Sequence, residues 1–247
     1  MSDSLYDQPD LYDLIAPTDP AMSGFYLDIV RANGPRVLDL ACGTGRITLP
    51  LARAGLEVVG GDLSELMLVA ARAAAAKDGI AAEFVPLDMR DFDLERTFDT
   101  IVIAANSILH LQTTADFGSF FASVRRHLRP GGQLAFDAFV PSVGLLSLPP
   151  DERQEVGTFA HPVLGDVRLE ETIRYDPIEQ VSYADWYWSA PDRPDFQHMP
   201  LAMRQIFPQE MPLLLAAGGL HLVERYGDFD RSPLTTESRR QVCIAAV

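Results

Sequence analysis

Residues 36–48 (RVLDLACGTGRIT) pass from an apolar strand through two glycines into a helix. The strand is predicted at Val37–Leu40, and the helix is indicated by apolar positions on one face after Gly45. Glycine takes positive φ and lets a ligand approach the backbone, and the first turn of a helix offers unpaired N–H groups. The segment therefore predicts an α/β sheet that binds a ligand at the carboxyl edge of its strands.

An acidic residue strengthens this prediction. Asp62 ends the next predicted strand, at about the spacing from the glycines at which a carboxylate meets a ribose diol. Thr48 stands where the dinucleotide fingerprint has its third glycine, so a pyrophosphate site would be less well formed. An NAD-dependent oxidoreductase is the alternative enzyme class, and Thr48 argues against it. A purely structural glycine turn is the other alternative.

Four segments together resemble one family. Residues 39–45 resemble motif I of the class I S-adenosylmethionine-dependent methyltransferases, and residues 62–67 resemble their second-strand acidic motif. Residues 87–91 resemble the adenine loop, and residues 128–132 the turn before strand five. The motifs follow the family's order across residues 36–137. The resemblance implies S-adenosylmethionine as cofactor and S-adenosylhomocysteine as product.

The resemblance also implies which residues bind the cofactor. Asp62 would bind the ribose, Met67 would contact the adenine, and Asp88 would bind the adenine amino group, although a turn aspartate is the plain alternative. The full set of expected cofactor-binding residues is Tyr12, Asp39, Ala41, Gly43, Gly45, Arg46, Asp62, Leu63, Met67, Asp88, Met89, Ala104 and Asn106. A non-catalytic protein that binds this cofactor would carry the same motifs, so that alternative stays open.

Two residues are candidates for the chemistry. Tyr6 belongs to a Tyr-rich N-terminus, and similar small-molecule members of the family use such a segment to close over cofactor and acceptor. His110 follows the predicted fourth strand (98–104), where the family places residues near the methyl group. A surface lid packed by its tyrosines and a structural histidine are the alternatives. The Asn/Asp-Pro-Pro-aromatic signature of many enzymes that methylate nucleic acid or protein is absent there.

The fold expected for residues 1–247 is a single α/β domain with a seven-stranded, Rossmann-like, mostly parallel sheet. Residues 1–34 are expected to form an N-terminal lid and a helix at 19–32. An antiparallel β insertion at 141–207 is expected to cap the active site, with strands at 166–175, 181–188 and 198–207. Other expected elements are a helix at 64–76, a strand at 81–86, a strand at 133–139, a helix at 209–217 and strands at 220–225 and 241–246.

The insertion carries aromatic side chains suited to a planar or polar small molecule. An ordinary amphipathic sheet or a dimer contact is the alternative. The expected substrate-binding residues are Phe139, Arg174, Trp186 and Trp188.

Charge narrows the class of partner. The formal net charge is −15, which disfavours nucleic acid and anionic membrane surfaces. The N-terminus lacks the apolar region of a signal peptide, and no apolar run is long enough to span a membrane. Cys42 and Cys243 indicate neither a disulfide framework nor a metal site. A cytoplasmic monomer or homodimer without a metal is expected.

These observations lead to one functional expectation. The chain is expected to methylate a small molecule, with N-methylation of a heterocycle or amine as the first choice and O-methylation of a small metabolite as the alternative. The overall layout also resembles the bacterial toxoflavin-type azapteridine N-methyltransferases.

Overall fold

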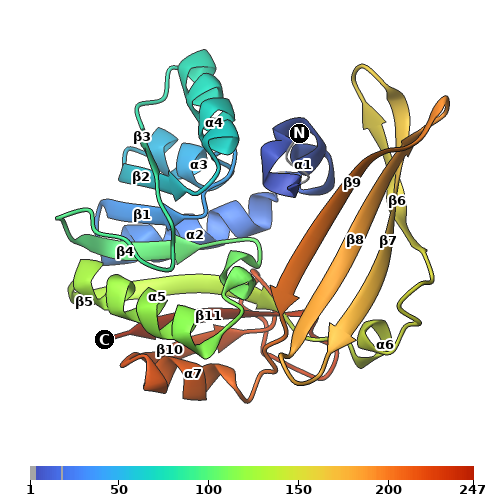
Figure 1. The fold of residues 1–247 in the computed structure, drawn as a ribbon. Helices are drawn as coiled ribbons and strands as arrows, with labels where there is room; N and C mark the ends of the chain where they lie inside the picture. Colours follow the sequence, from blue (N-terminus) through green and yellow to red (C-terminus); the bar gives the residue numbers. More distant parts are fainter. Residues whose placement is uncertain (1–3, 18) are drawn as a thin grey trace.

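A computed structural model describes residues 4–17 and 19–247 of the chain. Its main sheet has seven strands in the order β10-β11-β5-β4-β1-β2-β3 (Figure 1). These strands are β1 (Arg36–Leu40), β2 (Glu57–Asp62), β3 (Glu83–Pro86), β4 (Phe98–Ile103), β5 (Leu128–Phe139), β10 (His221–Tyr226) and β11 (Arg240–Ala246).

The strand directions follow from the pairing. The pairs β1–β2, β1–β4, β2–β3 and β4–β5 are parallel, whereas β11 runs antiparallel to both β5 and β10. All strands except β11 therefore end at the same edge of the sheet. This arrangement confirms the predicted seven-stranded, mostly parallel, Rossmann-like sheet.

Helices cover both faces of this sheet, as the central strands require because both of their faces are apolar. On one face α2 and α3 pack over Val37, Val102 and Ala135, and on the other α5 and α7 pack over Ile101, Leu134 and Phe136. The helices are α1 (Pro9–Ile15), α2 (Pro20–Asn33), α3 (Thr48–Arg53), α4 (Glu65–Asp78), α5 (Thr114–His127), α6 (Val143–Leu146) and α7 (Met211–Ala217), with 3₁₀ turns η1 (Leu5–Asp7) and η2 (Ser107–His110).

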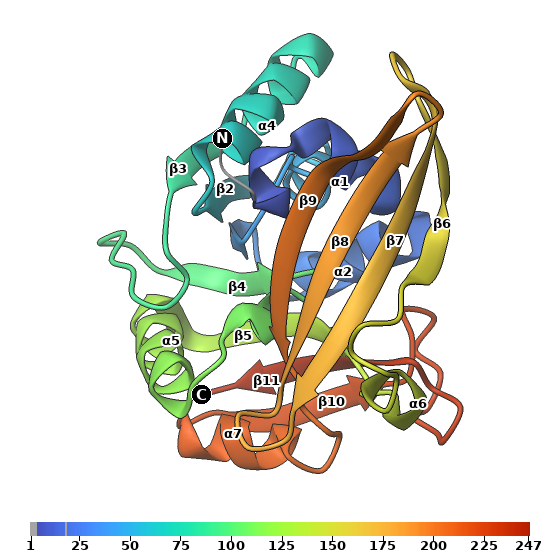
Figure 2. The ribbon, with the colours of Figure 1, turned by 45° about the vertical axis from the view of Figure 1, so that its right-hand side comes forward.

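A second sheet stands beside the carboxyl edge of the first (Figures 1 and 2). It is antiparallel throughout, in the order β6-β7-β8-β9, and we call it the cap sheet. Its strands are β6 (Gln154–His161), β7 (Gly165–Asp176), β8 (Val181–Ala190) and β9 (Arg193–Arg204).

The cap sheet differs from the sequence prediction in two ways. The prediction missed β6 altogether, and it began the last strand at residue 198 instead of Arg193. The pair Ala190 and Arg193 closes a tight hairpin, so the ladder starts directly after the turn. Pro194 is tolerated within β9 because β9 is an edge strand.

The N-terminal segment lies between the cap sheet and α4 (Figure 1). Leu5 and Leu11 are buried against Leu169, Trp188 and Met199 of the cap sheet. We call residues 4–15 the lid segment. Its apolar side chains join the cap sheet to the sheet edge at which the sequence places the ligand.

Candidate functional site

The turn after β1 is built around a buried carboxylate. Thr48 Oγ1 donates a hydrogen bond of 2.6 Å to Asp39 Oδ2, and both side chains are buried. Burial raises the pKa of Asp39 to about 7, although the bond from Thr48 acts in the opposite direction. Thr48 therefore occupies the position of the third glycine with a hydroxyl that satisfies Asp39. Gly45 has a φ of +91°, which side chains rarely adopt, and a Cβ there would lie a tight 3.1 Å from Leu49 Cγ.

Asp62 is held at the end of β2 by backbone donors. The N–H of Gly43 reaches Asp62 Oδ2 at 2.8 Å, and the N–H of Ser64 reaches Oδ1 at 2.9 Å. Burial raises the pKa of this carboxyl, and the two backbone bonds counteract that effect. The glycine turn after β1 and the carboxylate after β2 are thus one hydrogen-bonded unit.

A cavity of about 460 Å³ opens at this unit, and we call it the cofactor cavity. Apolar side chains and the carboxylates of Asp7, Asp62 and Asp88 line it, which suits a nucleoside with a flat base and a diol. Its lining includes the predicted residues Tyr6, Tyr12, Ala41, Gly43, Asp62, Leu63, Asp88, Met89 and His110. The Asp88 carboxylate is already paired with the Arg90 guanidinium, with Nε to Oδ1 at 3.0 Å, and this pairing lowers the pKa of Asp88.

A narrow cavity of about 20 Å³ lies on the other side of Ala41. Asp39, Arg46 and Ala104 line it, together with Tyr12, whose ring lies 5.2 Å from the Arg46 guanidinium carbon. This space, which we call the narrow cavity, therefore brings together Asp39 and Arg46 from the β1 turn and Ala104, which directly follows β4.

Three predicted cofactor residues line neither of these two cavities: Gly45, Met67 and Asn106. Met67, in the first turn of α4, is fully buried and does not line the cofactor cavity. Ser64 caps α4 by accepting from the N–H of Met67, and the Met67 side chain packs into the interior. Leu63, 71% exposed, is the side chain presented to the cavity instead. Asn106 lines a neighbouring cavity, described next.

The neighbouring cavity measures about 530 Å³, and we call it the acceptor cavity. It shares four lining residues with the cofactor cavity: Tyr6, Tyr12, Ser107 and His110. Phe139 and Trp186, both expected at the substrate, line it as well. Sequence reasoning missed Leu201, Met203, Asp137 and Arg239, which line the same space.

The two candidate catalytic residues are in direct contact on the wall between these cavities. Tyr6 Oη lies 2.6 Å from His110 Nε2, and the rings meet edge to face. Burial raises the pKa of Tyr6 and lowers the pKa of His110, while a hydrogen bond to the Ala202 backbone raises the latter. In the neutral tautomer that carries its hydrogen on Nδ1, the ring accepts at Nε2 from the Tyr6 hydroxyl.

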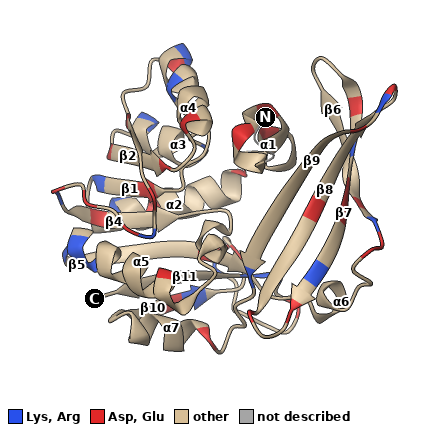
Figure 3. Cartoon of the chain, viewed as in Figure 1, with Lys and Arg blue, Asp and Glu red and all other residues tan. Residues whose placement is uncertain are grey.

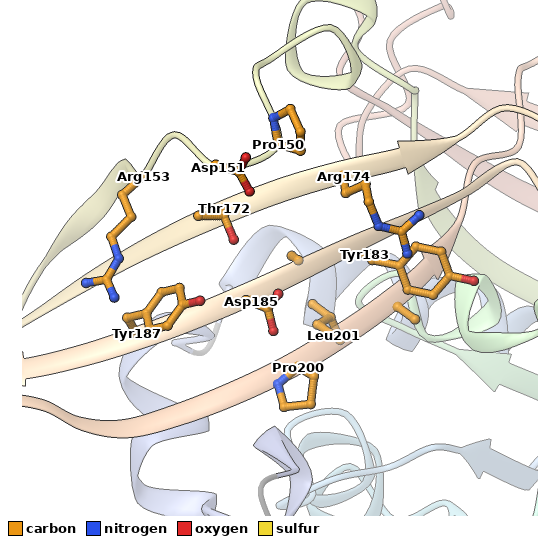
Figure 4. Close-up of a pocket in the computed structure, with 12 residues that line it drawn as sticks. Pro150, Asp151, Arg153, Thr172, Arg174, Tyr183, Asp185, Tyr187, Pro200 and Leu201 are labelled. Carbon is orange, nitrogen blue, oxygen red and sulfur yellow. The ribbon is translucent and has the colours of Figure 1, made fainter.

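Arg174 and Trp188 do not line the acceptor cavity, contrary to expectation. Arg174 projects from the opposite face of the cap sheet and stacks on Tyr183, 4.3 Å from its ring centroid (Figure 4). The register explains this, because Glu171 pairs with Trp186 and side chains alternate along β7. Trp188 shares the inner face with Trp186 but is fully buried against the lid segment.

The lid segment is hydrogen-bonded to the loops that follow β1 and β2. Ser64 Oγ donates to the Tyr6 carbonyl at 2.6 Å, and Thr44 Oγ1 donates to Asp13 Oδ1 at 2.8 Å. Sequence reasoning identified Ser64 only as a helix cap and did not single out Thr44. Nothing in the local pattern indicates these partners, since the contacts join distant segments.

Other kinds of site were also considered. Within residues 4–17 and 19–247, no group of three or more His, Cys, Asp or Glu side chains could hold a metal ion. None of the helices in this part of the chain has both the length and the apolar character needed to cross a membrane. Lys and Arg are dispersed over several elements in the view of Figure 3.

Comparisons with known proteins agree with this geometry. Residues 37–132 match the family described as "Methyltransferase domain". The chain is 32% identical to the "Putative methyltransferase YqeM" of Bacillus subtilis (strain 168) over 83% of its own length and 81% of that protein. The chain belongs to the class I S-adenosylmethionine-dependent methyltransferases. This confirms the predicted family, enzyme class and cofactor.

Two further relatives of this methyltransferase extend the comparison. The structure of the CcbJ methyltransferase from Streptomyces caelestis superimposes with a TM-score of 0.84 at 26% identity, covering 100% of this chain and 99% of that one. The dTDP-3-amino-3,4,6-trideoxy-alpha-D-glucopyranose N,N-dimethyltransferase of Streptomyces venezuelae is 36% identical over 51% of this chain and 54% of its own length. The first match includes the cap sheet, so the whole architecture recurs in that enzyme.

Proposed function

We propose that this methyltransferase transfers a methyl group to a nitrogen of a small molecule held in the acceptor cavity. The main support for the proposal is that the cofactor cavity and the acceptor cavity share lining residues. Tyr6 and His110 line both the cofactor cavity and the acceptor cavity, so a reacting nitrogen beside them adjoins the cofactor. The name of the Streptomyces venezuelae relative, an amino-sugar N,N-dimethyltransferase, supports a nitrogen acceptor.

The cofactor would be held by the residues of its two cavities. Asp62 is placed to accept hydrogen bonds from the ribose diol, with its own orientation fixed by the N–H groups of Gly43 and Ser64. Asp88 and Met89, which line the cofactor cavity, would contact the adenine, whereas Arg46 and Tyr12, which line the narrow cavity, would contact the methionine part. When bound, S-adenosylmethionine supplies an electrophilic methyl group on a sulfonium that is itself a good leaving group.

The protein therefore contributes mainly alignment. With His110 in the tautomer protonated on Nδ1, the Tyr6 hydroxyl donates a hydrogen bond to Nε2, and the lone pairs of the Tyr6 oxygen would be free to accept from an N–H of the acceptor. That hydrogen bond would orient the amine for attack by its nitrogen lone pair on the methyl group. The edge-to-face contact with His110 keeps the Tyr6 ring in place.

O-methylation is the second candidate, and one observation favours it. An oxygen nucleophile needs a base, and the lowered pKa of His110 leaves an uncharged ring nitrogen next to a hydroxyl on the cavity wall. In this case a proton would pass from the acceptor through Tyr6 to His110.

A turnover screen tests the proposal. The enzyme is incubated with S-adenosylmethionine and a panel of dTDP-3-amino sugars, amino acid amides, azapteridines of the toxoflavin type, and catechols. We expect S-adenosylhomocysteine release and one-methyl mass gain with at least one amine or ring nitrogen. Turnover of catechols alone would establish the O-methyl candidate. Binding of S-adenosylhomocysteine without turnover of any panel member would contradict catalysis and favour a non-catalytic cofactor-binding protein.

A further inference from the structure

The chain turns sharply after β4, at the point where three cavities meet. Ala105 lines both the narrow cavity and the acceptor cavity, and Asn106 lines the acceptor cavity. Both residues have left-handed backbone conformations, with φ of 57° and 65°. Side chains with a Cβ disfavour this region, so two such residues in succession need support from their surroundings.

A buried carboxylate on the neighbouring strand supplies that support. Asp137 Oδ1 accepts from the N–H of Ala105 at 2.8 Å, and Oδ2 accepts from the N–H of Asn106 at 3.2 Å. Successive N–H groups in such a turn point to one side and form a concavity for an anion, which here is the Asp137 side chain. Bonds of this kind, from N–H groups to a carboxylate, are stronger than neutral ones.

A third contact completes the environment of Asp137. The Tyr26 hydroxyl of α2 donates to Asp137 Oδ1 at 2.7 Å, and Tyr26 is fully buried. Asp137 itself is only 3% exposed. Burial raises the pKa of the Asp137 carboxyl, and the bonds from Tyr26, Ala105 and Asn106 counteract this effect. The buried Asp137 carboxylate in the apolar strand β5 is therefore compensated by three hydrogen-bond donors, which are Tyr26 Oη and the N–H groups of Ala105 and Asn106.

The corner leaves one polar group facing the acceptor cavity. In residues 4–17 and 19–247, the side-chain amide of Asn106 has no hydrogen-bond partner, whereas its backbone N–H is fixed by Asp137. The direction of that amide and the position of Ala105 thus depend on a carboxylate that lies in the sheet.

We propose that Asp137 is a positioning residue for methyl transfer, acting by holding the Ala105–Asn106 corner in the conformation that joins the acceptor cavity to the cofactor. The inference rests on the proposed function for its kinetic consequence but not for its structural one. Asp137 acts through the corner and through no bond to the reacting atoms.

The test compares Asp137→Asn with Tyr26→Phe. The first variant weakens the bonds to the corner, whereas the second removes a bond to the same carboxylate and leaves the corner bonds intact. With the best amine from the turnover screen, we expect Asp137→Asn to lower kcat/KM by about 10²-fold, the scale of a small misplacement in an active site. The Kd for S-adenosylhomocysteine should change less than about threefold, and Tyr26→Phe should leave kcat/KM within about threefold.

A rescue variant separates positioning from general damage. Glycine takes the left-handed conformation readily, so adding Ala105→Gly to Asp137→Asn should recover at least about tenfold of the lost kcat/KM. Should Asp137→Asn alone fail to fold, the comparison with Tyr26→Phe is made in the Ala105→Gly background. Equal losses in the Asn and Phe variants, a matching loss of cofactor affinity, or an unchanged kcat/KM would each overturn the proposal.

An activity-free measurement distinguishes failure of this inference from failure of the proposed function. Amide hydrogen exchange of Ala105 and Asn106 is followed by NMR in the S-adenosylhomocysteine complex. We expect exchange at least about tenfold faster in Asp137→Asn, with little change in Tyr26→Phe. Unchanged exchange in Asp137→Asn would overturn the inference, even if the screen finds no amine that is turned over.

Discussion

Tyr6 Oη and His110 Nε2 lie 2.6 Å apart, although 104 positions separate the two residues in the sequence. The contact joins the lid segment to the turn after β4 and places a hydroxyl on the wall shared by the cofactor and acceptor cavities. When the neutral imidazole carries its hydrogen on Nδ1, it accepts from the phenol. The first two predictions concern this pair.

Removing the Tyr6 hydroxyl should slow turnover only partially. Tyr6→Phe loses one hydrogen bond to the acceptor, worth about 0.5–1.5 kcal/mol, so we expect kcat/KM to fall roughly 2- to 13-fold. The Kd for S-adenosylhomocysteine, measured by calorimetry, should stay unchanged because the aromatic ring remains. A loss of cofactor affinity equal to the loss of kcat/KM would show that Tyr6 acts on the cofactor alone.

Replacing the His110 ring tests for a general base. His110→Ala should lower turnover less than the roughly 10²–10⁴-fold that a lost general base produces, because alignment dominates our mechanism. The wild-type rate should also show an acid limb. Burial lowers the pKa of His110 below its usual value of about 6.5, so Nε2 accepts from Tyr6 at neutral pH and is protonated only as pH falls through that lowered pKa.

The pH profile of the His110→Ala variant serves as the control for this limb. It should be flat over the range in which the wild-type rate declines. A loss beyond about 10²-fold in a folded variant that still binds S-adenosylhomocysteine would instead establish His110 as a general base.

Asp62 should carry much of the cofactor affinity. Asp62→Ala removes a carboxylate that the Gly43 and Ser64 N–H groups orient toward the cavity. We expect the binding free energy for S-adenosylhomocysteine to weaken by about 1.5–3 kcal/mol, as measured by calorimetry. Asp185→Ala, on the outer face of the cap sheet, is the matched control (Figure 4). Equal affinities of the two variants for S-adenosylhomocysteine would show that Asp62 does not bind the ribose.

The two faces of the cap sheet should differ in their effect on the acceptor. Trp186→Ala removes an aromatic side chain from the acceptor cavity and should raise the acceptor KM about 2- to 13-fold, the scale of an aromatic contact worth about 0.5–1.5 kcal/mol. Arg174→Ala, on the outer face, should leave that KM unchanged. A larger rise in the acceptor KM for Arg174→Ala than for Trp186→Ala would support the expectation from the sequence that Arg174 binds the substrate.

Asp39 should make the free enzyme less stable as pH rises. Its folded pKa of about 7 lies above its ordinary value of 3.8, so the native state binds more protons between those two values. The stability that Asp39 contributes is therefore present below pH 3.8 and lost as pH rises toward about 7. Asp39→Asn should flatten this part of the pH dependence of unfolding by urea. A slope identical to that of the wild type would show that Asp39 does not titrate there.

The sequence predicted β1, the glycine turn and β2 well because their signals are local. The strand, the glycine turn and Asp62 lie within one short segment, and their geometry follows from backbone preferences. The cap sheet was harder to predict. A register shift between Glu155 and Gly157 breaks the alternation of β6, so the period-two pattern that marks a strand is lost there.

The direction of individual side chains was the other feature that the sequence could not predict. Trp186 and Arg174 both lie on predicted strands, but only the pairing of Glu171 with Trp186 reveals that they face opposite ways. Met67 follows the acidic motif as in the family pattern, yet its side chain is buried in the core. The bonds of Asp137 to the corner also join segments that no local pattern connects.

The fastenings of the lid segment to Ser64 and Thr44 have a consequence for the order of events during catalysis. The lid segment lines both the cofactor cavity and the acceptor cavity. If it opens to exchange S-adenosylhomocysteine for S-adenosylmethionine, it would also expose the acceptor to solvent. An amine that receives two methyl groups would therefore leave between the first and second transfer. The monomethylated intermediate should accumulate freely in solution early in the time course, as in a distributive rather than a processive enzyme.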